Sequence, residues 1–241
     1  MKINLNPEVD PQTKIIVALD VPSAAEALNL CDRLPQVSFW KVGLELFIAD
    51  GSSILRELKA RDKKIFLDLK LHDIPNTVAS ACRSATKYGA DFLTIHAAGG
   101  KAMMKAAQAE VQGSSTQLLA VSLLTSISAL ELASDLKVSI EVPEYVSEMV
   151  LNAQSSGLTG AVCSPHEVAK LRSQLNLKQG DNFCFVTPGV RPAGSASGDQ
   201  SRVMTPKAAI AAGANYLVIG RPITAAPDPV VAWESICQEL S

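Results

Sequence analysis

The sequence predicts an α/β protein built as a single (β/α)8 barrel, the TIM barrel. Eight short apolar runs alternate along the chain with segments of helical periodicity, as parallel strands joined by helices do. The length of 241 residues is close to that of one such barrel, roughly 250 residues. The alternative is an open doubly wound sheet, which usually has a Gly-x-Gly-x-x-Gly turn after its first strand. Here the first strand ends in Leu-Asp-Val-Pro and no glycine follows.

The first repeat shows both patterns. Residues 14–20 form a compact apolar run rich in β-branched side chains. Pro22 then opens a helical stretch whose apolar residues recur at helical spacing, namely Ala24, Ala27, Leu28, Cys31 and Leu34. Further strands are expected at 39–44, 64–70, 92–96, 118–123, 160–163, 183–187 and 216–219, and an outer helix over 143–153. We therefore expect one domain over residues 1–241, with residues 1–12 as a candidate flexible N-terminal tail.

A short internal repeat supports the barrel. The segment Gly89-Ala-Asp-Phe-Leu-Thr-Ile95 resembles Gly213-Ala-Asn-Tyr-Leu-Val-Ile219. The two copies lead into the fourth and eighth expected strands, half a barrel apart. Each glycine is suited to the left-handed conformation that ends a helix before a turn into a strand. The alternative is a chance match between two loops with the same turn chemistry.

Composition excludes several classes of protein. Hydrophobic residues make up 47% of the chain and charged residues 19%, which is too apolar for a disordered chain. The formal net charge of -2 argues against nucleic-acid binding, which usually needs a basic excess. No signal peptide and no apolar run long enough for a membrane span is present. The five cysteines lack Cys-x-x-Cys spacing, so we expect a reduced, cytoplasmic protein without a zinc site. The aromatic content of 5% fits a barrel interior filled by Val, Ile, Leu and Ala.

Charged residues gather where the first three strands end. Asp20 ends the first expected strand, Lys41 lies on the second, and the third ends with Asp68 and Lys70, with Asp73 just beyond. Strand alternation puts Asp68 and Lys70 on one face. Active sites of these barrels lie at the carboxyl ends of the strands. Burying several charges at one barrel mouth is costly unless they pair with one another or with a ligand, so this set is the candidate catalytic array.

The ends of the last two strands are suited to binding phosphate. The eighth strand is followed by Gly220 and Arg221, which offer close backbone approach and a fork of donors. The seventh is followed by a long Gly- and Ser-rich segment that carries Arg191 and Gln200. Barrels often bind phosphate at these two loops. The segment is a candidate lid, with an ordinary surface loop as the alternative.

Two histidines lie near the expected array. His72 should point away from Lys70 because of strand alternation. His96 ends the fourth strand, where a structural role and a place in the barrel mouth both remain open.

The run Phe66-Leu-Asp68-Leu-Lys70-Leu-His-Asp73-Ile-Pro-Asn-Thr77 resembles the signature of the orotidine 5'-phosphate decarboxylase family, bacterial type. The resemblance extends from Asp20 to Arg221. It includes the segments Lys41-Val-Gly-Leu-Glu-Leu-Phe, His96-Ala-Ala-Gly-Gly, Leu124-Thr125-Ser126, Gly189-Val-Arg191, Asp199-Gln200-Ser-Arg202 and Ile-Gly220-Arg221. Asp-x-Lys-x-x-Asp alone is only moderately specific, because related sugar-phosphate barrels share it. The additional segments make the resemblance highly specific.

The resemblance implies a role for each matching residue. Lys41, Asp68, Lys70 and Asp73 would form the catalytic array, and Asp20 and Lys41 would hold ribose hydroxyls. Thr125 would face the pyrimidine edge. The 5'-phosphate would be bound by Arg191, Gln200, Gly220 and Arg221. In the family the residues matching Asp73 and Thr77 reach into the partner's site, which implies a homodimer.

The implied reaction converts orotidine 5'-monophosphate into UMP and CO2, the last step of de novo UMP synthesis, without a metal or organic cofactor. Lys70 would stabilise the carbanion at C6 of the pyrimidine and then donate the proton. Asp68 would either repel the substrate carboxylate or hold Lys70 in place, and the sequence leaves both roles open.

Two other functions remain as alternatives. A magnesium-dependent sugar-phosphate enzyme of the same barrel group typically has a Glu metal ligand where this chain has Lys41, and a lysine is a poor substitute. A ligand-binding barrel with a dead site would be expected to lack part of the charged array, and none is missing.

Overall fold

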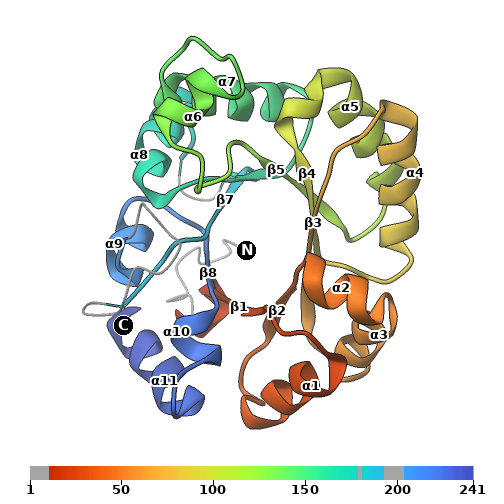
Figure 1. Ribbon diagram of the computed structural model, residues 1–241, viewed down its shortest axis with the longest axis vertical. Helices are drawn as coiled ribbons and strands as arrows, with labels where there is room; N and C mark the ends of the chain where they lie inside the picture. The colour runs from red at the N-terminus through yellow and green to blue at the C-terminus, as the bar shows by residue number, and fades with distance from the viewer. Residues whose placement is uncertain (1–10, 179–180, 193–203, 241) are drawn as a thin grey trace, which may run out of the picture.

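The chain folds into a closed barrel of parallel strands surrounded by helices (Figure 1). The computed structural model describes residues 11–178, 181–192 and 204–240. The strands are β1 (Ile15–Leu19), β2 (Phe39–Val42), β3 (Lys64–Leu71), β4 (Phe92–His96), β5 (Gln117–Val121), β6 (Gly160–Val162), β7 (Cys184–Thr187) and β8 (Tyr216–Ile219). They pair in sequence order, and β8 pairs with β1 to close the ring. The predicted fold class is therefore confirmed.

The strand boundaries agree closely with the sequence prediction. β4 and β8 have the predicted limits, and the other strands differ by one or two residues at one or both ends. β2 ends two residues before its predicted limit, because Gly43 caps the following helix and its carbonyl accepts a hydrogen bond from Phe47 N. Residues 1–10 of the expected tail lie outside the described residues, whereas Pro11 and Gln12 belong to the 3-10 turn Pro11–Lys14.

The helices lie outside the strands. They are α1 (Ala24–Arg33), α2 (Leu44–Asp50), α3 (Ser53–Ala60), α4 (Pro75–Thr86), α5 (Gly100–Val111), α6 (Ala129–Ser134), α7 (Val142–Ser155), α8 (Pro165–Gln174), α9 (Pro206–Ala211), α10 (Arg221–Thr224) and α11 (Pro229–Leu240), with a short 3-10 turn at Ala97–Gly99. Local sequence explains several helix starts: Ser23 caps α1 by accepting from Glu26 N, and Ser128 forms a capping box with Glu131. None of the helices in the described part of the chain has the length and apolar character to span a bilayer.

The barrel interior differs from the expectation of aliphatic filling alone. Three aromatic rings form its floor, with centroid distances of 5.2 Å for Phe39–Phe92, 5.8 Å for Phe39–Tyr216 and 5.2 Å for Phe92–Tyr216. Phe66 packs on Phe92 at 5.9 Å. Phe39, Phe92 and Tyr216 are the first residues of β2, β4 and β8, so this floor lies at the amino ends of the strands, while aliphatic side chains such as Ile16 complete the interior. A low overall aromatic content therefore did not reveal where the aromatic residues are concentrated.

The two copies of the internal repeat make the same set of hydrogen bonds at the starts of β4 and β8. In the first copy, Asp91 precedes β4, and its Oδ2 atom accepts hydrogen bonds from Lys59 Nζ at 2.7 Å and from Ile65 N at 2.8 Å. The Asp91 backbone N–H donates to the Ile65 carbonyl at 2.9 Å. One carboxylate thus ties the start of β4 to β3 and to the helix before β3.

The second copy repeats these contacts with an amide in place of the carboxylate. Asn215 Oδ1 accepts from Arg172 at 2.8 Å and from Phe185 N at 2.9 Å, and Asn215 N donates to the Phe185 carbonyl at 2.9 Å. Both leading glycines have positive φ, 67° at Gly89 and 102° at Gly213. The matching contacts argue against a chance resemblance between the two segments.

We expect Asn215→Ala to lower the free energy of unfolding by about 1–3 kcal/mol, because it leaves the buried Phe185 N–H and one Arg172 N–H without their acceptor. Urea denaturation at an unchanged m-value measures this loss. Asn215→Asp is the matched control. It introduces a carboxylate, as Asp91 does in the first copy, so an acceptor remains and most of the stability should be retained. An equal loss in both variants would contradict the explanation.

Candidate active site

A cavity of about 500 Å³ opens at the carboxyl ends of the barrel strands. Residues at or just beyond the ends of most of the strands line it, including Asp20 after β1, Asp68 and Lys70 on β3, and Arg221 after β8. The complete lining is Ala18, Asp20, Lys41, Phe66, Asp68, Lys70, Val121, Leu123, Leu124, Thr125, Val162, Cys163, Pro188, Gly189, Arg191, Val218, Gly220 and Arg221. Most of the residues that the sequence singled out therefore meet in one place, although they come from widely separated parts of the chain.

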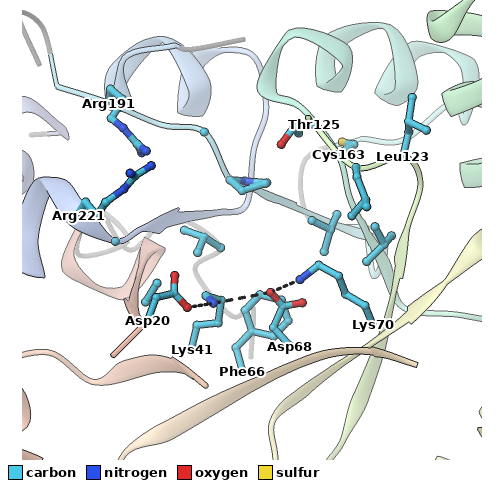
Figure 2. A pocket seen from close by; sticks show the side chains of 18 residues that line it. Asp20, Lys41, Phe66, Asp68, Lys70, Leu123, Thr125, Cys163, Arg191 and Arg221 are labelled. Atoms are coloured by element: carbon cyan, nitrogen blue, oxygen red, sulfur yellow. Dashed lines mark hydrogen bonds and ion pairs between the residues drawn. The ribbon is translucent and has the colours of Figure 1, made fainter. Parts of the chain in front are cut away.

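Four charged side chains of alternating sign form a row on one side of this cavity (Figure 2). Lys41 Nζ lies 2.6 Å from Asp20 Oδ1 and 3.8 Å from Asp68 Oδ2. Lys70 Nζ lies 2.8 Å from the same Asp68 Oδ2 atom. The side chains of Lys41 and Asp68 are only 10% and 12% exposed, and that of Lys70 is 29% exposed. The Asp20 side chain is more open, at 57% exposed. Mutual pairing explains how the buried charges of Lys41 and Asp68 are accommodated.

Gly43 makes room for the first pair of this row. A Cβ atom at position 43 would lie 2.8 Å from Lys41 Nζ and 3.0 Å from Asp20 Oδ1. Any side chain there would push the ammonium away from its carboxylate. The sequence carries little sign of this role for Gly43, apart from its place two residues after Lys41.

Lys70 reaches the cavity through an unusual backbone conformation. Strand alternation predicted that Asp68 and Lys70 share a face, and both do line the cavity. However, Lys70 has a φ of 49°, and the register of β3 with β4 shifts between Leu67 and Leu71. A left-handed conformation at a residue with a long side chain costs about 1–3 kcal/mol and tends to occur at functional sites.

Two arginines lie across the cavity from Lys70. Figure 2 shows the guanidinium groups of Arg191 and Arg221 pointing toward each other from the chain after β7 and from the start of α10. Arg191 is 8% exposed and donates a hydrogen bond to the Val190 carbonyl at 2.9 Å. Gly220 and Thr125 also line the cavity, whereas Gln200 lies outside the described residues. Among the described lining residues, four cationic side chains face two carboxylates, which favours an anionic ligand.

Asp73 and Thr77 do not line the cavity of their own chain. Both are exposed on the surface beyond β3. The Oδ1 atom of Asp73 accepts a hydrogen bond from the adjacent Ile74 N at 2.6 Å. The predicted array of four charged residues is therefore assembled without Asp73 within a single chain.

The two histidines pack beside the array and outside the cavity lining. The rings of His72 and His96 are 5.4 Å apart. Burial lowers the pKa of His96, and the nearby positive charges of His72 and Lys70 lower it further. A half-buried ring that packs against its neighbour fits the structural role considered for His96.

The carboxylates of the row already have cationic partners. Asp20 and Asp68 both contact Lys41, and Asp68 also contacts Lys70. Within the described ranges, no three His, Cys, Asp or Glu side chains gather in a way that could hold a metal ion. The chemistry available here is that of ammonium and guanidinium groups facing an anion.

Comparison with known proteins identifies the family. The sequence profile of the "Orotidine 5'-phosphate decarboxylase / HUMPS family" matches residues 13–236. The chain belongs to this family. The match covers the whole barrel, from the start of β1 to the last helix.

Relatives within the orotidine 5'-phosphate decarboxylase / HUMPS family cover nearly the full chain. A protein of Gloeothece citriformis named orotidine 5'-phosphate decarboxylase is 61% identical over 95% of this chain and 97% of its own length. One of the same name from Nostoc is 57% identical over 95% of this chain and 97% of its own. The crystal structure of orotidine 5'-phosphate decarboxylase from Lactobacillus acidophilus has a TM-score of 0.82 at 40% identity, covering 94% of this chain and 98% of that one. The resemblance predicted from the sequence motifs is therefore confirmed at the level of the family.

Proposed function

We propose that the chain decarboxylates orotidine 5'-monophosphate to UMP and CO2, as the last step of pyrimidine nucleotide synthesis in the cytoplasm. The observation that carries this proposal is the row Asp20–Lys41–Asp68–Lys70, which faces two arginines across one cavity. The substrate is anionic at both ends, with a phosphate on the ribose and a carboxylate on the base. Relatives that match almost the full chain carry the name of this enzyme. The five cysteines are thiols and not disulfides, which is consistent with a reducing compartment.

Lys70 is the residue we assign to the chemical step. When the bond between C6 and the carboxyl carbon breaks, CO2 leaves and the electron pair stays at C6. An ammonium group beside C6 stabilises that negative charge and can then transfer a proton to the same carbon. The Lys70 ammonium lies in the cavity, and its position is supported by the contact of 2.8 Å with Asp68. Both electron pair and proton are accounted for without an external electron sink.

Of the two roles left open for Asp68, the contacts favour positioning. The Oδ2 atom of Asp68 contacts Lys70 directly and faces Lys41 at 3.8 Å. A carboxylate so engaged holds the ammonium in place before the substrate binds. Repulsion of the substrate carboxylate would add to this effect, since Asp68 also lines the cavity.

We assign the opposite side of the cavity to the 5'-phosphate. Arg191, Arg221 and Gly220 line this side, and Gln200 is the fourth residue that the family resemblance implies. Guanidinium groups can bind phosphate oxygens in pairs. We assign Asp20 and Lys41 to the ribose hydroxyls, because their pair lies between the arginines and Lys70 (Figure 2). Thr125 is assigned to the pyrimidine edge.

We expect Arg221→Ala to lower kcat/KM by about 2–3 kcal/mol, or roughly 30- to 150-fold, because a charged contact to phosphate is lost. With orotidine, which lacks the phosphate, the variant and the wild type should differ little. Arg56→Ala removes an arginine that is exposed on α3 and serves as the matched control. An unchanged kcat/KM for the phosphorylated substrate, or an equal loss with orotidine, would contradict this assignment.

A magnesium-dependent sugar-phosphate enzyme is the second candidate, and the family name itself combines two groups. Lys41 argues against it, since its ammonium lies between the two carboxylates that would otherwise be free to bind a cation. The deciding experiment follows the ultraviolet absorbance of orotidine 5'-monophosphate with purified protein in the presence of a chelator. Turnover under these conditions supports the decarboxylase. Turnover only in the absence of the chelator supports the magnesium enzyme. Absence of turnover under both conditions supports the magnesium enzyme with another substrate or a barrel with a dead site.

We also propose a homodimer in which Asp73 and Thr77 complete the partner's cavity. Both residues are exposed and lie outside their own cavity. Three large apolar side chains in the segments after β2 and β3 are also exposed, namely Leu44 at 50%, Ile48 at 80% and Ile74 at 67%. They follow the neighbouring strands β2 and β3. An exposed apolar group beside polar residues is typical of a protein–protein interface.

A further inference from the structure

We propose that Thr94 is a positioning residue for this reaction, because its hydroxyl fixes both the backbone of Lys70 and the carboxylate of Asp68. The inference rests on the decarboxylase function proposed above. Thr94 lies in the middle of β4 with a relative exposure of 0%, and it does not line the cavity. It therefore acts through its neighbours and not by contact with the substrate.

The direction of both hydrogen bonds follows from their chemistry. The backbone N–H of Lys70 lies 2.8 Å from Thr94 Oγ1. An amide N–H can only donate, so the Thr94 oxygen accepts this bond. Its own proton is then directed to Asp68 Oδ1, which lies 2.9 Å away and can only accept as a carboxylate. One hydroxyl thus satisfies a donor and an acceptor that belong to the two central residues of the charged row.

The first of these bonds supports the unusual backbone at Lys70. The φ of 49° there is unfavourable for a residue with a Cβ atom. Between Leu67 and Leu71 the regular pairing of β3 with β4 is interrupted. The Lys70 N–H uses a side-chain acceptor of β4 at this point. Strained conformations persist only where the surrounding structure specifies them, and Thr94 supplies such a contact.

Because of the second bond, the two oxygens of the Asp68 carboxylate have different partners. Oδ1 is held by Thr94, while Oδ2 contacts Lys70 at 2.8 Å and faces Lys41 at 3.8 Å. Because both oxygens are engaged, the carboxylate cannot rotate without breaking a buried contact. Thr94 thereby sets the position of the Lys70 ammonium twice, once through its main chain and once through its ion-pair partner.

The test is the variant Thr94→Val, which removes the hydroxyl and keeps the branched shape. We expect kcat for orotidine 5'-monophosphate to fall roughly 10- to 100-fold, because a loosened ammonium no longer lies where C6 charge develops. KM and the affinity for UMP should stay within about threefold of wild type, since the residues assigned to phosphate and ribose are unchanged. Unfolding of a fraction of the protein would also lower the apparent kcat without changing KM, so kcat is calculated per UMP-binding site. A loss of kcat that remains after this correction is not due to general destabilisation of the barrel.

Three further variants separate positioning from stability. Thr94→Ser restores the hydroxyl and should recover most of kcat. Thr94→Cys offers a weaker S–H group of similar size and should give an intermediate kcat even if the valine variant folds poorly. Thr116→Val is the matched control: this buried threonine donates to the Ala90 carbonyl at 2.7 Å, at the opposite end of β4 from the cavity. It should lower stability without lowering kcat.

Wild-type kcat in Thr94→Val or Thr94→Cys would overturn the inference. So would a serine variant as slow as the valine variant, or an equal loss of kcat in Thr116→Val. An inactive wild-type protein is a separate outcome that would overturn the proposed function, and this inference with it.

Discussion

Replacement of Lys70 by alanine is expected to lower kcat for decarboxylation by at least about 10⁴-fold, while leaving a folded protein that still binds UMP. In the role proposed for Lys70, two contributions would be lost together, the charge that stabilises the C6 carbanion and the proton that quenches it. No other ammonium group in the described part of the chain is expected to take its place. Lys41 is paired with Asp20 at 2.6 Å and lies away from the end of the cavity that Lys70 occupies (Figure 2).

The structure indicates that this variant should fold. Alanine also carries a Cβ atom, so the backbone at φ 49° is strained to a similar degree in both proteins. Asp68 retains its hydrogen bond from Thr94 and the approach of Lys41. Stopped-time assays of CO2 release measure the loss, and titration with UMP checks that the cavity is intact.

Lys64→Ala is the matched control for this prediction. Lys64 begins the same strand, β3, and is exposed at the end away from the cavity. Its removal should leave kcat unchanged. Appreciable turnover by Lys70→Ala, or a comparable loss in Lys64→Ala, would refute the role assigned to Lys70.

The fold was largely predictable because its signals are local. Runs such as 92–96 and 216–219 are bounded by turn residues, and the structure has β4 and β8 at these limits. The aromatic floor was not predictable in the same way. Whether Phe39, Phe92 and Tyr216 meet depends on how the strands are staggered around the closed barrel, and no local pattern carries that information.

The residues that form the charged row were predictable from the sequence, but their arrangement in space was not. Alternation placed Asp68 and Lys70 on one face, and strand order brought Lys41 beside them. The left-handed backbone at Lys70 had no sequence signal, because no glycine marks it. Thr94 and Gly43 were missed for a related reason: each acts through contacts with residues on other strands or loops. Such contacts become visible only in three dimensions.

Mixing two inactive variants is expected to restore activity if the site is shared between subunits. Asp73→Ala should inactivate the site to which this residue is donated, and Lys70→Ala should inactivate the site of its own chain. In a heterodimer of the two, one site lacks both groups and the other lacks neither. Random pairing in a twofold dimer makes half of the dimers mixed, so co-expression should recover about a quarter of wild-type activity. Each variant alone should remain nearly inactive.

Asp68→Ala combined with Lys70→Ala is the control for the mixing experiment. Both residues line the cavity of one chain, so every site in their heterodimer lacks one of the two and no activity should return. If Asp73 acted within its own chain, its mixture with Lys70→Ala would also stay inactive, and the shared site would be refuted. Recovery in the first mixture and not in the second would distinguish donation by the partner from simple stabilisation by dimer formation. It would also explain why Asp73, which is exposed and accepts a hydrogen bond from the adjacent Ile74 N–H, belongs to the predicted catalytic motif without lining its own cavity.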